Sequence, residues 1–275
     1  METARALHYA CGMQTLTIGN HLREWRQRRR LSQLDLALDA EISTKHLSFL
    51  ETGRAQPSRE MVLRLAERLD VPLRERNVLL VSAGYAPVFP QRALQDPALQ
   101  QARKAIDLVL KGHEPYPALA VDRHWTLAAH NAAVPPLLAS ASPKLMQPPV
   151  NVLRLSLHPE GLAPRIENLA EWRAHLLARL RQQIDVTADP VLTALFDELA
   201  AYPAPGGAKA ARMNITQDYT GVVMPLRFAT NAGTLSLFST TTVFGTPVDV
   251  TLAELAIESF FPADAATAEL LRKLG

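Results

Sequence analysis

Apolar positions recur at helical spacing in short stretches over the first ninety residues of the chain. In the first stretch, Ile18, Leu22 and Trp25 are spaced so that they share one face of a helix. A Ser, Thr or Pro residue suited to begin a helix precedes each stretch. The pattern therefore predicts five short helices, which begin near Thr17, Ser32, Ser43, Pro57 and Pro72.

The second and third predicted helices have the spacing of a helix-turn-helix. Residues 33–39 form the second, and we expect its apolar face to comprise Leu34, Ala37 and Leu38. Residues 44 to about 52 form the third, and we expect its inward residues to be Leu47 and Leu50. Ala37 is the fifth residue from Gln33, at the point where two closely crossing helices need a small side chain.

In a helix-turn-helix the second of the two helices lies in the major groove, where its outward side chains reach base edges. The outward residues of the third predicted helix offer hydrogen-bonding groups, one cation and one apolar surface. They are Thr44, Lys45, Ser48 and Phe49.

Residues 31–58 resemble the helix-turn-helix of the xenobiotic-response-element and Cro repressor family. The match includes the Leu-Ser-Gln opening, the exit Leu-Glu-x-Gly-x-x-x-Pro-Ser and the five-helix layout. The resemblance implies DNA contacts from Gln33, Thr44, Lys45 and Ser48. We add three candidates for DNA contact, which are Ser43, Phe49 and Arg54, the last of them to a phosphate.

Two features of this region leave alternatives open. The family has glycine at the ninth motif position, but here it is Glu41, which costs about 1 kcal/mol in a left-handed turn, so we expect a slightly altered turn. Five arginines lie close together and either form the solvated face of a helix or contact phosphates. They are Arg23, Arg26, Arg28, Arg29 and Arg30.

The remaining sequence predicts a second, α+β domain over residues 98–275, after a proline-containing linker at residues 86–97. The predicted elements are a helix at 98–111, strands at 118–121 and 125–128, helices at 166–183 and 190–202, strands at 222–229 and 233–244, a strand at 252–261 and a helix at 264–274. This order is compatible with a PAS-like sensor, in which a small antiparallel sheet and flanking helices enclose a pocket.

Residues 98–274 resemble the ligand-binding domain of the MmyB-like transcription regulators. The likeness rests on the segments NVLRLSLHPEGL and LSLFSTTTVFGTPVDVTLAELAIESFFPAD and on the two-helix insert between them. It implies a PAS-like fold and a small lipophilic ligand of a fatty-acid-like kind. The fold class expected for the whole chain is an all-α five-helix helix-turn-helix domain (residues 17–85) followed by an α+β PAS-like domain.

An apolar pocket in the second domain would draw on large apolar side chains. The candidates are Trp125, Leu127, Leu153, Trp172, Leu176, Leu226 and Phe238, each of which has plain core packing as its alternative. Arg154 or Arg227 would hold a carboxylate head group through a bidentate guanidinium contact, with a surface salt bridge as the alternative.

Composition narrows the choice of function. The single cysteine, Cys11, excludes a disulfide framework and a cysteine-based zinc cluster, and the net charge of +2 does not by itself indicate a nucleic-acid binder. We find no motif of a hydrolase, a phosphate loop or a dinucleotide site, so we expect neither an enzyme nor a cofactor. The longest uncharged stretch is rich in Thr and Ser, so we expect no membrane span.

The sequence therefore predicts a cytoplasmic transcription regulator that binds double-stranded operator DNA as a homodimer and senses a small lipophilic ligand. Dimerisation is expected because one recognition helix reads only a few base pairs and useful specificity needs two half-sites about 34 Å apart. The alternative is a second domain used only for dimerisation or partner binding. Residues 1–16 are expected to be a disordered tail or upstream sequence.

Overall fold

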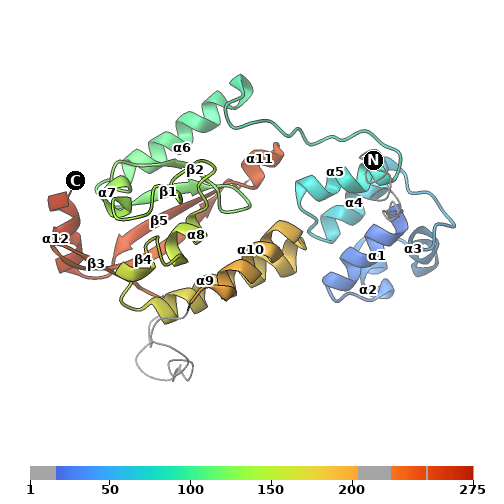
Figure 1. Ribbon diagram of the computed structural model, residues 1–275. Helices are drawn as coiled ribbons and strands as arrows, with labels where there is room; N and C mark the ends of the chain where they lie inside the picture. The colour runs from blue at the N-terminus through green and yellow to red at the C-terminus, as the bar shows by residue number, and fades with distance from the viewer. Residues whose placement is uncertain (1–16, 204–223, 246, 275) are drawn as a thin grey trace, which may run out of the picture. The chain divides into compact units, whose positions relative to one another are not determined.

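The computed structural model describes residues 17–203, 224–245 and 247–274, and the tail expected at residues 1–16 lies outside them (Figure 1). The chain divides into two compact units with their boundary between Gln91 and Arg92. We call them the N-terminal unit and the C-terminal unit. No helix in the described part of the chain is both long and apolar enough to cross a membrane.

The described part of the N-terminal unit, from residue 17 on, contains the five helices that the sequence predicts. They are α1 (Ile18–Arg28), α2 (Gln33–Asp39), α3 (Thr44–Glu51), α4 (Arg59–Arg68) and α5 (Leu73–Ser82). The hydroxyl groups of Thr17, Ser32, Ser43 and Ser58 each accept a hydrogen bond from a backbone amide three residues ahead. These bonds satisfy amides that the helix itself leaves unpaired, which is why the helices begin where the sequence predicted.

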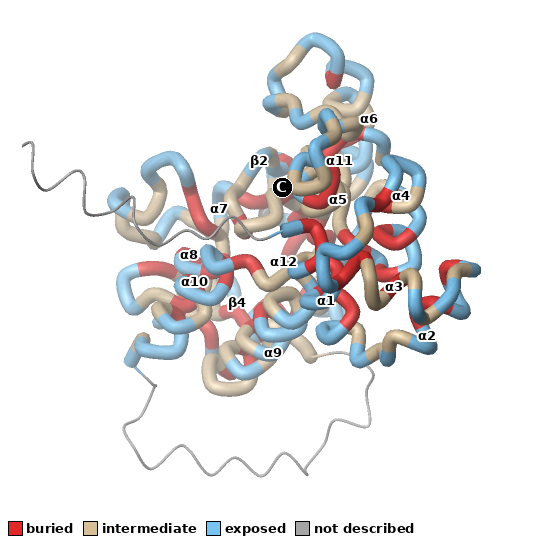
Figure 2. The backbone as a smooth tube through the Cα atoms, turned by 90° about the vertical axis from the view of Figure 1, so that its right-hand side faces the viewer, coloured by how far each residue is buried: buried red, intermediate tan, exposed pale blue. Residues whose placement is uncertain are grey.

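The expected apolar face of α2 is wrong at two of its three positions. Leu36 and Ala37 are buried, whereas Leu34 is 56% exposed and Leu38 is 69% exposed. A helix of seven residues makes fewer than two turns, so its leucines fit more than one apolar stripe. Packing against α3 and α4 decides between them, and Ala40, just after the helix, is also buried. Buried positions along the backbone are red in Figure 2.

The turn after α2 keeps the left-handed conformation that glycine favours, in spite of the substitution by glutamate. Glu41 has a φ of 56°, and the amide of Ile42 donates to the carbonyl oxygen of Ala37 over 2.9 Å. The altered turn that we expected is therefore not found. The strain is taken up at Glu41 itself.

Helices α1 and α3 approach each other closely at Gly19. A Cβ atom at this position would lie 2.6 Å from the carbonyl oxygen of Leu50 and 2.7 Å from that of Glu51. Only glycine allows this contact, because neither carbonyl group is a flexible side chain that can move aside.

The C-terminal unit combines a five-stranded antiparallel sheet with helices on both faces (Figure 1), as the predicted α+β class requires. Its strands are β1 (Ala118–Val121), β2 (Leu127–His130), β3 (Leu226–Thr230), β4 (Gly233–Val243) and β5 (Ala256–Pro262), in the order β2-β1-β5-β4-β3. Its helices are the short turns η1 (Pro97–Leu99) and η2 (Ala163–Arg165), and α6 (Gln100–Gly112), α7 (Pro135–Leu138), α8 (Val152–Leu157), α9 (Leu169–Thr187), α10 (Pro190–Ala201), α11 (Val250–Ala253) and α12 (Ala265–Leu274).

Two predicted boundaries in this unit are wrong for local reasons. Strand β2 begins at Leu127, since Trp125 has a φ of 65° and ends a turn that starts at Asp122. Asp249 caps the short helix α11, so the last strand begins at residue 256 instead of 252. Helix α8 was not predicted at all. The first residues of the strand expected at 222–229 lie outside the described part.

The two faces of the sheet pack against different helices. Ala118 and Ala120 of β1 and Ile257 of β5 contact α6, which contributes Ile106 and Leu110. The opposite face, which includes Leu235 and Leu237 of β4, belongs to the larger core with α8, α9 and α10. Because side chains alternate along a strand, this division decides which residues line the interior described below.

Candidate nucleic-acid interface and internal cavity

The outward side of α3 presents a small basic and polar surface. Lys45 is exposed, whereas Thr44, Ser48 and Phe49 are half-buried. The Lys45 ammonium lies 5.7 Å from the centre of the Phe49 ring, and the guanidinium of the exposed Arg54 lies 5.8 Å from it on the chain that leaves the helix. Two cations therefore share one aromatic ring, and both remain accessible to an anionic partner.

Ser43 has a structural task at the start of the same helix. Its hydroxyl oxygen accepts from the amide of His46 over 3.1 Å, so this oxygen is committed to the cap. The hydroxyl proton is still available to a partner.

Gln33, on α2, is held by a buried ion pair that links α1 and α3. Arg26 donates to both carboxylate oxygens of Glu51, over 2.6 and 2.9 Å, and Gln33 donates its side-chain amide to the same carboxylate over 2.8 Å. The Glu51 side chain is 2% exposed. The hydrogen bonds to Glu51 raise the pKa of Arg26 above its ordinary value, so the guanidinium keeps its positive charge. The amide carbonyl of Gln33 is thereby held in one orientation.

The five arginines of the cluster fall into two groups. Two of them make contacts that hold helices together, and three are exposed. Besides Arg26, Arg29 donates to the carbonyl oxygens of Leu69 and Asp70 over 2.7 and 2.8 Å and so joins α1 to the end of α4. The other three arginines are exposed. Neither of the two expected readings therefore describes the whole cluster.

The C-terminal unit encloses a cavity of about 110 Å³ between the sheet, α8 and α9. Most of its lining side chains are leucine, valine, tryptophan or phenylalanine. Six of the seven apolar residues proposed for a pocket line it, namely Trp125, Leu127, Leu153, Trp172, Leu176 and Leu226. Among the described residues, no group of three His, Cys, Asp or Glu side chains is placed to hold a metal ion.

Phe238 and the two arginines considered for a head group are not among the lining residues. Arg154 pairs with Glu198 at 2.8 Å on the surface, with 44% of its side chain exposed. Arg227 is exposed on β3. Phe238 stacks on Phe261, because its neighbour Ser239 takes the position that faces the cavity.

The polar end of the cavity, which the sequence analysis missed, is an ion pair between α9 and β5. Arg179 donates to Glu258 over 2.7 and 3.2 Å, and the hydroxyl of Thr241 donates to the same carboxylate over 2.8 Å. The guanidinium also lies 4.9 Å from the centre of the Trp125 ring. One signal was present in the sequence, since Glu258 is the one charged residue within the apolar segment of β5.

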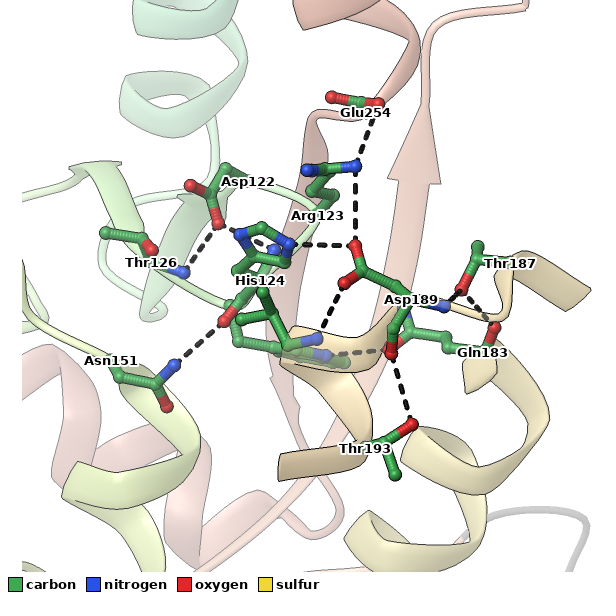
Figure 3. A network of polar contacts seen from close by, with 12 residues as sticks. Asp122, Arg123, His124, Thr126, Asn151, Gln183, Thr187, Asp189, Thr193 and Glu254 are labelled. Atoms are coloured by element: carbon green, nitrogen blue, oxygen red, sulfur yellow. Dashed lines mark hydrogen bonds and ion pairs between the residues drawn. The ribbon is translucent and has the colours of Figure 1, made fainter. Parts of the chain in front are cut away.

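The turn before β2 contacts the junction of α9 and α10 through His124 and Arg123, which reach Asp189 (Figure 3). Trp125 lines the cavity and donates to Gln183 over 2.7 Å, while the preceding His124 contacts Asp189 over 2.9 Å. Arg123 lies 3.3 Å from the same carboxylate. Burial by itself raises the pKa of Asp189. The hydrogen bonds from His124 and from the Val191 amide lower it by more, so the pKa of Asp189 lies below its ordinary value.

Comparison with known proteins places both units in recognised families. Residues 102–274 match the MmyB-like transcription regulator ligand binding domain, and residues 17–79 match a helix-turn-helix domain. A search of curated proteins found no match.

Two solved structures resemble the chain only distantly. The clp gene regulator ClgR from Corynebacterium glutamicum has 24% identity and a TM-score of 0.23, over 38% of this chain and 97% of its own. An RNA-binding light-oxygen-voltage receptor has 12% identity and a TM-score of 0.27, over 99% of this chain and 65% of its own.

Proposed function

The chain belongs to the MmyB-like transcription regulators, and from this premise we propose that it binds operator DNA as a homodimer and that a small molecule in the cavity controls the binding. Its two domains are those of a DNA-binding transcription regulator, as the sequence predicted. The observation that carries the proposal is the outward face of α3 and of the chain that leaves it, where Lys45 and Arg54 flank Phe49.

In this proposal the side chains of α3 read base edges while the flanking residues fix the position on the backbone. Thr44, Lys45 and Ser48 supply donors and acceptors for bases, and the ring of Phe49 supplies apolar contact for thymine methyl groups. Arg54 contacts a phosphate. Ser43, at the start of α3, and Gln33, at the start of α2, also contact the DNA. The side-chain amide of Gln33 is already oriented by its hydrogen bond to Glu51.

Two half-sites read by two copies of α3 would supply the specificity that one copy lacks. An exposed apolar pair on α5 supports a homodimer, since Val78 is 40% exposed and Val81, one turn further along, is 57% exposed. The two domains have one arrangement that can bind DNA and one that cannot. The ligand acts by binding one of these two arrangements more tightly than the other. The protein would carry out this role in the cytoplasm.

The decisive experiment selects an operator from random DNA with the full chain and then measures binding by fluorescence anisotropy. Lys45→Ala is expected to weaken operator binding by about 1–3 kcal/mol, with the helical content unchanged. Lys104→Ala is the matched control, because it removes another exposed lysine, on α6. Equal losses in both variants would contradict the assignment of α3.

Sedimentation of the same protein tests the homodimer. We expect two chains on an operator with two half-sites, whereas a single chain on that DNA would overturn this part of the proposal.

A further inference from the structure

We propose that the C-terminal unit controls the chain that joins it to the N-terminal unit by holding or releasing Arg92 at helix α11. While Arg92 is held, residues 90–91 are the joint between two fixed points of the chain. This inference rests on the proposed function, because it supplies a route by which a ligand in the cavity changes DNA binding.

The first fixed point lies within the N-terminal unit, where Asn77 of α5 binds the chain that follows the helix. Its side-chain oxygen accepts from the amides of Val88 and Phe89, each over 3.1 Å, and its side-chain nitrogen donates to the carbonyl oxygen of Phe89 over 2.7 Å. Val88 also packs against the core of this unit. The chain is therefore fixed as far as Phe89, and we call these contacts the Asn77 clamp.

The second fixed point lies within the C-terminal unit, where Arg92 is bound to the residues that begin α11. Arg92 donates to the carboxylate of Asp249 over 3.0 Å, and its carbonyl oxygen accepts from the hydroxyl of Thr251 over 2.6 Å. The Asp249 side chain is 2% exposed and also caps α11 by accepting from the amide of Thr251. Arg92 therefore moves with α11, and we call these contacts the Arg92 clamp.

The joint between the two clamps has few degrees of freedom. The ring of Pro90 fixes its φ at about −65°, so rotation remains at ψ of Pro90 and at φ and ψ of Gln91. Once Arg92 is released, the next residue packed in the C-terminal unit is Leu94, against the core between the sheet and α6. Release therefore extends the joint from residues 90–91 to residues 90–93 and gives the two units many more relative orientations.

A short stretch connects α11 to a strand that borders the cavity. Residues 254 and 255 join α11 to β5, on which Glu258 and Phe260 line the cavity. Leu255 is 2% exposed, so the stretch is packed against the core and cannot absorb a movement of the strand as an exposed loop would. A ligand that displaces β5 therefore displaces the residues that hold Arg92.

A second contact reaches the end of α11 from the turn before β2 (Figure 3). Arg123 lies 3.9 Å from Glu254, directly after α11, and 3.3 Å from Asp189. Trp125, two residues further along the turn, lines the cavity. Both a strand and a turn at the border of the cavity are thus connected to α11, which makes this helix the point where a change in the cavity reaches Arg92.

Limited trypsin digestion of the full chain, without DNA or ligand, measures whether Arg92 is held. Trypsin needs several extended residues on each side of the bond that it cuts, so cleavage after Arg92 requires both clamps to open, and its rate follows the population of the open form. Mass spectrometry quantifies the product that ends at Arg92. The product that ends at Arg181, within α9, reports unfolding of the C-terminal unit.

One variant of each clamp tests the joint. Asn77→Ala removes three hydrogen bonds and should speed cleavage after Arg92 at least about tenfold. The double variant Asp249→Asn/Thr251→Val keeps an acceptor for the cap but weakens both contacts to Arg92, and should speed this cleavage at least about fivefold. Asn231→Ala, at an exposed position between β3 and β4, is the control and should leave the rate unchanged.

A variant of the cavity tests the control of the clamp. Glu258→Gln weakens the pair with Arg179 on β5 and should raise the ratio of cleavage after Arg92 to cleavage after Arg181. Glu198→Gln weakens the surface pair with Arg154 and should leave this ratio unchanged. If Glu258→Gln does not fold, Phe260→Leu, in the same strand and at the same cavity, takes its place.

Equal cleavage after Arg92 in the unchanged protein and in both clamp variants would overturn the joint. A ratio that stays the same when the cavity is altered would overturn its control of Arg92. Either result leaves the proposed function standing, because the comparison of operator binding with Lys45→Ala does not depend on the joint.

Discussion

Gln33 of α2 donates its side-chain amide to the buried carboxylate of Glu51 at the end of α3, over 2.8 Å. Since Arg26 of α1 donates to the same carboxylate, three helices meet at one anion. The side chain of Gln33, which is proposed to contact DNA, is therefore already oriented before DNA binds. This reduces the loss of side-chain conformational entropy on binding.

Removal of this carboxylate should destabilise the N-terminal unit. Glu51→Ala leaves the guanidinium of Arg26 buried without its partner, and we expect a loss of about 3–5 kcal/mol in the free energy of unfolding, measured with urea. Asp39→Ala is the control, because the Asp39–Arg68 pair is exposed and spans 3.8 Å, so its loss should change the stability by less than about 0.5 kcal/mol. Similar effects of the two variants would contradict this account.

The exposed leucines of α2 should tolerate polar replacement. Leu34→Gln and Leu38→Gln are expected to change the free energy of unfolding by less than about 0.5 kcal/mol, because both side chains already face solvent. Leu36→Ala, in the fully buried position between them, should cost about 2–5 kcal/mol. The opposite ranking in thermal denaturation would restore the apolar face that the sequence suggested.

Glycine in the turn after α2 should stabilise the protein. Glu41 has a φ of 56°, and relief of this strain by Glu41→Gly is expected to raise the stability by up to about 1 kcal/mol. Gln27→Gly places a glycine in the last turn of α1, outside the left-handed region, and should instead lower the stability, by less than the roughly 1 kcal/mol that glycine costs in a helix interior. A rise in melting temperature for Glu41→Gly together with a fall for Gln27→Gly is the expected result.

His175 should make the C-terminal unit sensitive to mild acid. Burial, and then the positive charge of Arg179, lower the pKa of His175, which stacks on Trp172. The unfolded chain takes up a proton at its ordinary pKa of about 6.5, and the folded chain does so only at lower pH, so stability falls as the pH drops through this window.

The variant His175→Gln cannot take up this proton. Above about pH 8, the urea midpoints of the two proteins should change with pH in the same way. Between about pH 6.5 and the lower pKa of the folded protein, the midpoint of His175→Gln should fall less steeply than that of the unchanged protein. Parallel pH profiles for the two proteins would show that the histidine does not contribute.

Features that depend on a few neighbouring residues were predicted well from the sequence. The hydroxyl caps at Thr17, Ser32 and Ser43 bind amides within the same turn, so residue type and spacing suffice to locate them. The start of β2 escaped prediction because Trp125, a residue common in strands, is held in a left-handed turn by Asp122.

Features that depend on distant residues were not predictable in the same way. Arg154 fits a head-group site by its chemistry, yet Glu198, which follows it by 44 residues, pairs with it on the surface. The ion pair that closes the cavity joins Arg179 to Glu258 across 79 residues, and only the folded sheet brings them together. Apolar lining residues were easier to propose, because large apolar side chains gather in any interior.

The contact at Gly19 gives α3 two sides that differ in the substitutions they tolerate. The side toward α1 is constrained by close packing, and the side toward solvent is not. Toward α1 the backbone of residues 50 and 51 admits no side chain larger than hydrogen at position 19. Toward solvent, exchange of Lys45 meets no such limit, because the side chain is exposed. With the DNA contacts proposed for α3, a copy of this protein that arises by gene duplication would acquire a new set of target genes by substitutions on one side of a single helix, while the scaffold that carries the helix is inherited unchanged.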